Sequence, residues 1–392
     1  MKLIKIDKTF KPLNFYFYYI PVLAAALIGL ADAVYLSVSH YRIYTDIGYK
    51  SFCAISYALN CDTVSMSSYS VFLGVPVPDW GVVGYLIILI LLCFAGRRDK
   101  ASKSLWPLIF WVSFLYSLIS IVLAAVSEFL IHSYCIMCIL SYFVNFSLLY
   151  YAWFINRRFN DFGVVRGLAA SIGFLWKERR KVIPVGLVFI FFVSSFIVWL
   201  PEYWNLTLPK SSRSMPSGIT EDGHPWIGAE HPQLVITEFS DYMCPHCRKF
   251  HFNLRQLMEK YPDRIRLIHR NFPMDSKVNP IVGKPFHEGA AKLAVIAFYA
   301  LEHQRFWDLN DYLFNLNLTN KHEVNIKKIA KDVGLDEQGA LHSLKDRHLW
   351  LRLAKDISEG LRLGISGTPA FVIDGKVYQG YIPADVLNKV IK

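Results

Sequence analysis

Six of the seven cysteines in this 392-residue sequence fall into three closely spaced pairs. The pairs are Cys53/Cys61, Cys135/Cys138 and Cys244/Cys247. Paired thiols can form a disulfide and exchange it with other thiols, because a thiolate attacks a disulfide sulfur directly. The seventh, Cys93, stands inside a long apolar run, where we expect a small buried side chain. The spacing therefore predicts thiol–disulfide chemistry at three places in the chain.

The motif Cys244-Pro-His-Cys247 lies between a predicted strand and a predicted helix. Its first cysteine then stands at a helix N-terminus, where unpaired N–H groups and the helix dipole stabilise a thiolate. His246 adds a positive or hydrogen-bonding group nearby. A structural disulfide or half of a zinc site is the alternative, but His251 and His269 complete no recognised zinc spacing. We therefore expect a redox pair and no metal.

The sequence around this motif resembles the DsbA-type thioredoxin-fold oxidases over residues 231–392. The resemblance is carried by Glu238–Cys247, by the helical block that follows, and by Gly367-Thr368-Pro369 before a strand. It implies a cis peptide bond at Pro369, which places Thr368 against the Cys244 sulfur and presents a strand edge to unfolded protein. It also implies that Glu238 is a buried acid that accepts a proton from Cys247. An ordinary carboxylate at a strand end is the alternative for Glu238.

The motif Cys135-Ile-Met-Cys138 opens an apolar run and so also lies at a predicted helix N-terminus. Tyr142 and Asn145 follow on the same helical face. Polar groups on a membrane helix usually face the bundle interior or a cavity, so a dithiol on this face predicts a cofactor pocket. Hydrogen bonding between helices is the alternative for Asn145.

Cys53 and Cys61 lie between the first two apolar runs, where a static disulfide is the usual interpretation. Their surroundings, however, resemble the vitamin K epoxide reductase (VKOR) family over residues 14–155. A bacterial branch of that family is naturally fused to a thioredoxin-like domain. The matching stretches are Cys61-Asp-Thr-Val with Ser67 and Tyr69, Phe72–Pro76, Gly81, and Cys135–Asn145.

The VKOR resemblance implies a four-helix bundle around a quinone, either ubiquinone or menaquinone, capped by the loop that carries the first cysteine pair. Cys135 and Cys138 would be the active dithiol, with Cys138 nearest the quinone, and the loop pair would be the shuttle. The residues expected at the quinone pocket are Cys138, Tyr142, Ser67 and Asn145. The DsbA-like partner is larger than the minimal thioredoxin domain of the commoner fusion.

Five apolar runs are long enough, or nearly so, to cross a bilayer as helices. They are Phe15–Ser39, Gly81–Gly96, Leu105–Val126, Cys135–Ile155 and Val182–Leu200. The first run is long and lacks a small-residue cleavage site, so we expect it to be retained rather than removed as a signal peptide. With 54% hydrophobic residues, the composition is typical of a membrane protein.

The net charge of +11 is concentrated before the first run, between the second and third, and between the fourth and fifth. The residues are Lys2, Lys5, Lys8, Lys11, Arg97, Arg98, Lys100, Lys103, Arg157, Arg158, Arg166, Lys177, Arg179, Arg180 and Lys181. Cytoplasmic loops are enriched in Lys and Arg, so the pattern indicates membrane topology rather than nucleic-acid binding. We expect a multi-pass protein of the bacterial inner membrane with a cytoplasmic N-terminus and periplasmic cysteine pairs.

The predicted fold class is an α-helical membrane bundle, with a four-helix core and a fifth transmembrane helix, followed by an α/β thioredoxin-fold domain with a helical insertion. We expect the membrane domain at 1–156, a cytoplasmic loop and fifth span at 157–200, a linker at 201–230 and the last domain at 231–392. Residues 159–176 are either an interfacial helix or a basic loop. The last domain has predicted strands at 234–239 and 265–269, helices over 287–363 with a break at Gly334, and a hairpin at 370–378.

These features predict an oxidase relay that drains electrons from reduced exported proteins into the quinone pool. The expected order is Cys244/Cys247, then Cys53/Cys61, then Cys135/Cys138. A reductive or isomerase pathway through the same cysteines is one alternative, although no predicted pair lies on the cytoplasmic side to import electrons. A non-enzymatic module that binds substrate at the strand edge near Pro369 is another.

Overall fold

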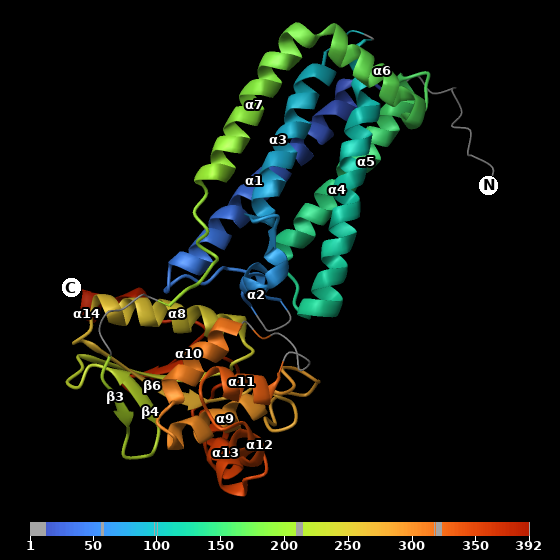
Figure 1. Ribbon diagram of the computed structural model, residues 1–392. Coiled ribbons are helices and arrows are strands. Elements are labelled where there is room, and N and C mark those ends of the chain that lie inside the picture. The colour runs from blue at the N-terminus through green and yellow to red at the C-terminus, as the bar shows by residue number, and fades with distance from the viewer. Residues whose placement is uncertain are drawn as a thin grey trace. The chain divides into compact units, whose positions relative to one another are not determined.

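The computed structural model describes residues 13–55, 59–97, 99, 101–208, 215–316, 318 and 324–391. The four N-terminal lysines, Arg98 and Lys100 of the charge pattern lie outside these residues. The chain divides into two compact units (Figure 1). One contains residues up to 202 except 42–50, and the other contains 42–50 and 203–392. Each unit is built around its own hydrophobic core.

Five helices of the first unit are long and apolar enough to cross a membrane, which confirms the five predicted runs. They are α1 (Tyr16–Thr45), α3 (Val77–Ala95), α4 (Trp106–Val126, within a helical stretch Ser102–Ile131), α5 (Ile136–Phe159) and α7 (Arg179–Trp199). The first helix continues beyond its predicted end at Ser39. Cys93 on α3 is exposed rather than buried, because it lies on the outer face of the bundle.

Helices α1, α3, α4 and α5 share one core, which includes Val22, Ile88, Ile109 and Leu148. All of α7 is described, and none of its residues is buried. The bundle therefore has a four-helix core with a fifth helix at its edge. Close packing depends on small residues: a Cβ at Gly29 of α1 would lie 2.3 Å from Cε1 of Tyr85 on α3.

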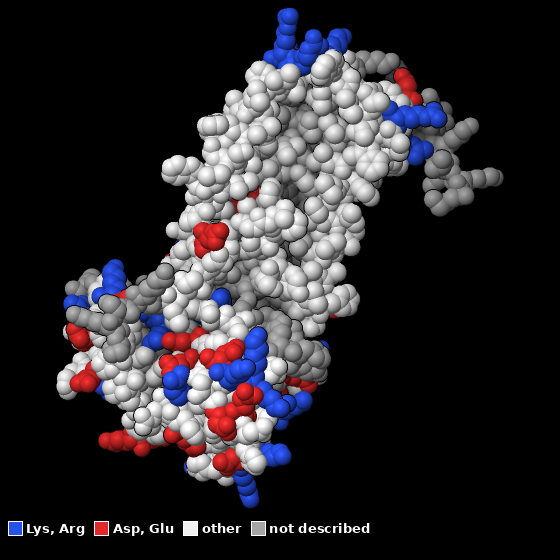
Figure 2. Space-filling model, viewed as in Figure 1, with Lys and Arg blue, Asp and Glu red and all other residues white. Residues whose placement is uncertain are grey.

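The segment between α5 and α7 forms a helix, α6 (Val164–Lys177). It is anchored to the bundle because the Ser171 hydroxyl donates to the Ser104 carbonyl at 2.6 Å and the Trp111 indole N–H donates to the Val164 carbonyl at 3.2 Å. Most of the segment 159–176 is therefore helical rather than a loop. Figure 2 shows Lys and Arg side chains gathered where α6 meets α7, and few charges along the body of the bundle.

The loop between α1 and α3 holds a short helix, α2 (Cys61–Met66), a 3-10 turn, η1 (Ser68–Ser70), and a two-stranded hairpin of β1 (Val71–Phe72) and β2 (Val75–Pro76). The Asn60 side chain caps α2 by accepting hydrogen bonds from Asp62 N at 3.0 Å and Thr63 N at 3.2 Å. An Asn at this position satisfies N–H groups that a helix start leaves unpaired. The cap stabilises the start of α2, and Cys61 is the first residue of that helix.

The second unit contains a six-stranded sheet with strand order β3-β4-β6-β5-β7-β8. The strands are β3 (Ser217–Ile219), β4 (Pro225–Gly228), β5 (Leu234–Ser240), β6 (Ile265–Asn271), β7 (Ala370–Ile373) and β8 (Lys376–Gln379). Strands β5 and β6 are parallel, and the other neighbours are antiparallel. The segment 201–230 was expected to be a linker, but its second half supplies β3 and β4. Both strands are short and contain Gly or Pro, a composition that resembles a linker.

Helices cover both faces of this sheet (Figure 1). On one face, α8 (Pro245–Lys260) and α14 (Ala384–Ile391) enclose a core with Phe250 and Phe371. On the other, α9 (Ala290–Glu302) and α13 (Arg347–Arg362) enclose a core with Phe239 and Phe298. The insertion is completed by α10 (Phe306–Leu316), α11 (Ile326–Asp332) and α12 (Glu337–Ser343). The predicted break at Gly334, where φ is +72°, separates α11 from α12.

Candidate active sites at three cysteine pairs

Cys53 and Cys61 form a disulfide with their Cα atoms 5.7 Å apart. The loop that carries it is fastened to the start of α5 by a short bridge between Leu59 and Tyr134. In this bridge, Asn60 N donates to the Tyr134 carbonyl at 2.9 Å. Because Cys61 follows Asn60 and Cys135 follows Tyr134, the bridge brings the two cysteines together.

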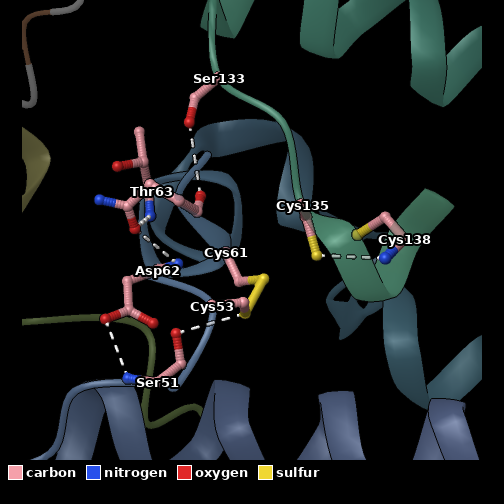
Figure 3. Close-up of a disulfide and its surroundings, with 9 residues drawn as sticks. Ser51, Cys53, Cys61, Asp62, Thr63, Ser133, Cys135 and Cys138 are labelled. Carbon is pink, nitrogen blue, oxygen red and sulfur yellow. Dashed lines mark hydrogen bonds between the residues drawn. A yellow bond between two sulfur atoms is a disulfide. The ribbon is translucent and has the colours of Figure 1, made fainter. Parts of the chain in front are cut away.

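Cys135 caps the N-terminus of α5, and its sulfur accepts a hydrogen bond from Cys138 N at 3.2 Å. An N–H group directed at a sulfur favours the thiolate form of that sulfur. Cys53, Cys61 and Cys135 are buried in one cluster, with Cys138 packed against it. Figure 3 shows the Cys135 sulfur between the disulfide and Cys138, which is present as a free thiol. The arrangement allows exchange between the two pairs.

Two of the residues expected at the quinone pocket are engaged in other contacts. Asn145 accepts a hydrogen bond from the Tyr85 hydroxyl at 2.9 Å and donates to the Ser120 hydroxyl at 3.0 Å, so its amide joins α3, α4 and α5. The Ser67 hydroxyl donates to the Val64 carbonyl at 2.8 Å, within the end of α2. Contacts between helices and within the loop therefore account for both side chains. Tyr142 remains one turn from Cys138 on α5.

Asp32 was missed by the sequence reasoning. It lies midway along α1, is 3% exposed, and accepts a hydrogen bond from the Ser141 hydroxyl at 2.5 Å. Its other carboxylate oxygen has no hydrogen-bond partner among the described residues. An acidic residue inside an apolar run was the available signal, because ionisable groups within membrane spans are usually functional.

Cys244 caps α8, and Cys247 lies in the first turn of that helix. The Cys244 thiol donates to the Thr368 carbonyl at 3.4 Å, and the Thr368–Pro369 peptide bond is cis. The Cys247 sulfur accepts a hydrogen bond from Asp241 N at 3.4 Å. Thr368 thus lies against the Cys244 sulfur, as the resemblance implied, and the two sulfurs have different partners.

The two thiols differ in acidity. Burial raises the pKa of Cys244, but the hydrogen bond from Cys247 and the positive charge of His287 outweigh burial and lower it to about 7. Burial and the neighbouring Cys244 raise the pKa of Cys247. Cys244 is therefore the sulfur that reacts as a thiolate near neutral pH. The positive charge that acts on it belongs to His287 rather than to the expected His246.

Asp241 and His287 form a second pair that the sequence reasoning missed. Asp241 is 1% exposed at the end of β5 and accepts hydrogen bonds from Met243 N at 2.7 Å, Met274 N at 2.6 Å and His287 Nδ1 at 2.8 Å. Burial lowers the pKa of His287, but the Asp241 carboxylate outweighs this effect and raises it. Asp241 therefore keeps a positive charge near Cys244. The acidic residue three positions before Cys244 was the only sequence signal.

Glu238 is buried on the sheet face that α8 covers, and its carboxylate lies 2.7 Å from Nδ1 of His269. His269 is adjacent to the Tyr242 hydroxyl, which donates to Asn310 at 3.1 Å. His251, expected to lack zinc-site partners, is paired with Asp311 at 3.1 Å. Within the described residues, no three His, Cys, Asp or Glu side chains are grouped to hold a metal ion.

Comparison with known families agrees with both halves of this architecture. Residues 20–153 match the model of the vitamin K epoxide reductase family, and residues 220–392 match the model described as thioredoxin. The chain joins a VKOR domain to a thioredoxin-like domain. The VKOR domain contains the first two cysteine pairs, and the thioredoxin-like domain contains the third.

Individual proteins match parts of the chain. Disulfide bond formation protein D of Bacillus subtilis is 22% identical over 43% of this chain and 76% of its own length. A Na(+)/H(+) antiporter, NhaA 3 of Salinispora tropica, is 25% identical over 42% of this chain. The matched region covers only 24% of the antiporter's own length. Among solved structures, a thioredoxin-like oxidoreductase from Silicibacter pomeroyi DSS-3 (25% identity, TM-score 0.36) aligns with 43% of this chain and 90% of its own. Alpha-DsbA1 of Wolbachia pipientis (22% identity, TM-score 0.36) aligns over 44% of this chain and 91% of its own length.

Proposed function

We propose that this thiol–disulfide oxidoreductase is a quinone-dependent oxidase that forms disulfides in exported proteins. The observation that carries the proposal is the buried cluster in the VKOR domain, where the loop disulfide packs directly against Cys135 with Cys138 beside it. A third pair, with an acidic Cys244 and a protonated Cys247, supplies the partner that such a relay needs.

The relay begins when a substrate thiolate attacks Cys244 of the Cys244/Cys247 disulfide. A second substrate thiol completes the substrate disulfide and leaves the pair reduced. The Cys244 thiolate then attacks Cys53 of the loop disulfide, and Cys247 displaces it. The released Cys61 attacks Cys135 of the Cys135/Cys138 disulfide, and Cys53 then attacks Cys61, which re-forms the loop disulfide and leaves the Cys135/Cys138 pair reduced. This dithiol would give its two electrons to a bound quinone. Each step except the last is thiolate attack on a disulfide.

The residues beside Cys138 fit a quinone. A quinone is an apolar ring whose carbonyl oxygens accept hydrogen bonds, and its reduction requires protons as well as electrons. The Tyr142 hydroxyl on α5 can donate to such an oxygen, and the free Asp32 carboxylate oxygen can hold a proton. When bound, the quinone supplies the two-electron acceptor. Tyr142 would orient it, and Cys138 would face it.

The proposed location is the bacterial inner membrane, with the cysteine pairs on the periplasmic side. Its support is the cluster of Lys and Arg between α6 and α7, because such clusters mark cytoplasmic loops. We propose a VKOR domain at 1–156, a cytoplasmic connection and fifth span at 157–200, and a thioredoxin-like domain that starts with β3 rather than at 231.

The order of the relay is tested by trapping in the full chain. In a Cys247→Ser variant, Cys244 cannot be displaced from the loop, so a Cys244–Cys53 mixed disulfide should accumulate. Non-reducing digestion and mass spectrometry identify it. A Cys93→Ser variant serves as the matched control because Cys93 lies outside the three pairs. A crosslink to Cys61 would reverse the proposed order within the loop, and a crosslink to neither cysteine contradicts the relay.

The direction of electron flow is tested by reconstitution with a soluble quinone and a reduced unfolded protein. Quinol and substrate disulfides should appear together in equal amounts. A Cys138→Ser variant should stop quinol formation. If disulfides form without quinol, the acceptor is not a quinone. A separate measurement is the redox state of Cys244/Cys247 in cells: if this pair is mostly reduced, the pathway runs in the reductive direction.

A further inference from the structure

We propose that Asp32 is the proton acceptor for Cys138, taking the thiol proton as the Cys135/Cys138 dithiol is oxidised and passing it toward the quinone. The inference rests on the proposed function, since it assigns a role to a residue beside the same dithiol. The proposed function gives Asp32 only the capacity to hold a proton, and the inference names Cys138 as the source of that proton.

The position of Asp32 is unusual for a carboxylate. It lies in the middle of an apolar helix, and only 3% of its surface is exposed. The Ser141 hydroxyl donates to one oxygen at 2.5 Å, while the other oxygen has no partner within the described part of the chain. A buried polar atom without a hydrogen bond is destabilising, so packing alone does not explain it.

Asp32 is held next to the reacting sulfur by α5. Ser141 is one helical turn after Cys138, so the two side chains lie on the same face of α5. The Ser141 hydroxyl that donates to Asp32 therefore holds this carboxylate on the side of α5 that carries Cys138. From α3, the Tyr85 hydroxyl donates to Asn145 on α5. Helix α4 contributes uncharged hydroxyls to this polar layer, through the contact of Ser120 with Asn145.

Oxidation of the dithiol requires a base. Forming the Cys135–Cys138 bond releases two electrons and two protons, and reducing a quinone to a quinol consumes two of each, so the step balances without an added reactant. A thiol reacts as its thiolate, and in the bundle interior bulk water is not available to remove its proton. Cys135 already accepts an N–H hydrogen bond that favours its thiolate, whereas Cys138 needs an acceptor. The free oxygen of Asp32 supplies one.

The test compares Asp32→Asn, which keeps the shape but cannot hold a proton, with Asp32→Glu and with Ser117→Ala. The Ser117 change is the packing control because it removes another buried hydroxyl of the bundle, which donates to the Ser113 carbonyl. Each full-length protein is fully reduced and mixed with a soluble quinone, and quinol formation is followed over one turnover. In parallel, without quinone, the rate at which a small maleimide alkylates Cys138 is measured by mass spectrometry.

We expect Asp32→Asn to slow quinol formation by about 100-fold or more, the usual contribution of a positioned proton acceptor. Alkylation of Cys138 should stay unchanged or become faster, because a negative charge near the thiolate has been removed. Asp32→Glu should retain most of the rate, and Ser117→Ala should match the wild type.

Three results would overturn the proposal. Quinol formation in Asp32→Asn within a few-fold of wild type excludes a proton-transfer role while leaving the proposed function intact. A parallel loss of quinol formation, Cys138 alkylation and thermal stability shows that Asp32 only packs helices together. A wild-type protein that reduces no quinone contradicts the proposed function itself, and the role of Asp32 with it.

Discussion

Cys244 and Cys138 are both first-turn or capping residues of helices, yet different groups surround them. The Cys244 thiol donates to the Thr368 carbonyl, and the hydrogen bond from Cys247 together with the positive charge of His287 lowers the pKa of Cys244 to about 7. Cys138 packs against the cluster of Cys53, Cys61 and Cys135, and its backbone N–H donates to the Cys135 sulfur. In the proposed relay, these different surroundings separate the cysteine that attacks a protein disulfide from the one that gives up electrons within the bundle.

The charge of His287 leads to a prediction about pH. The pKa of Cys244 is lowered to about 7, so its thiolate is present above that pH and is lost as the pH falls through it. Replacing His287→Gln removes a positive charge and should raise the pKa by about one unit, which slows alkylation of Cys244 roughly fivefold near pH 7 and little above pH 9. Rates of iodoacetamide alkylation across pH measure the effect.

The exposed His303 provides the control for this substitution, because His303→Gln removes an imidazole at the end of α9 whose contacts are with the carbonyl and the ring of Tyr299 rather than with Cys244. Its pH profile should overlay that of the wild type. If the His287→Gln profile also overlays it, the Asp241–His287 pair has no effect on Cys244.

At the scale of elements, two short connections position the membrane cysteines. The Leu59–Tyr134 bridge ties the α1–α3 loop to the start of α5 and so places one disulfide beside one dithiol. Further along α5, Asn145 joins three helices through hydrogen bonds to Tyr85 and Ser120. A rigid polar layer of this kind keeps the face of α5 turned toward the bundle interior.

The close contact between α1 and α3 gives a prediction about packing. A Cβ at Gly29 would lie 2.3 Å from the Tyr85 ring, so Gly29→Val must displace the tyrosine that donates to Asn145. We expect a loss of stability of about 1–3 kcal/mol, as for other overpacked cores. Thermal unfolding in detergent measures it. Gly186→Val on α7 is the matched control, because nothing within the described chain lies within 4 Å of a Cβ there, and equal losses in both variants would contradict the prediction.

At the scale of the whole molecule, basic side chains are concentrated at one end of the helical bundle (Figure 2). The basic residues Lys177, Arg179, Arg180 and Lys181 lie together where α6 meets α7, and the apolar helices carry few charges (Figure 2). Membrane topology follows from such an asymmetry, since loops rich in Lys and Arg stay in the cytoplasm. In the proposed orientation, five spans place residue 177 and the thioredoxin-like domain on opposite sides of the membrane.

Topology can be measured with single cysteines in a variant that lacks the native seven. Lys177→Cys, between the fourth and fifth spans, should react with an impermeant maleimide only in inverted vesicles. Lys355→Cys, in the thioredoxin-like domain, should react only in right-side-out vesicles or intact spheroplasts. The reverse pattern would contradict the proposed orientation, and labelling of both residues from one side would contradict the number of spans.

Local patterns in the sequence were sufficient for the long apolar helices, for the central strands and for the location of the cysteine pairs, but not for β3 and β4. Long apolar runs are readable as helices from composition alone, so all five described helices that are long enough to cross a membrane were predicted. The Asp374-Gly375 turn between β7 and β8 was readable because a tight hairpin needs residues that tolerate positive φ, here +49° and +74°. CxxC spacing at a helix start identified Cys135 and Cys244 for a similar local reason.

Only the tertiary structure decided which distant groups meet. Asp32 and Ser141, or Asp241 and His287, are far apart in the sequence, and no local period links them. Asn145 was expected at the quinone pocket, but its neighbours on α3 and α4 occupy its amide. Cys61 meets Cys135 because a backbone bridge joins their loops. The sequence alone determined which sulfurs can react, whereas contacts between distant segments determined which bases, charges and partner cysteines lie beside them.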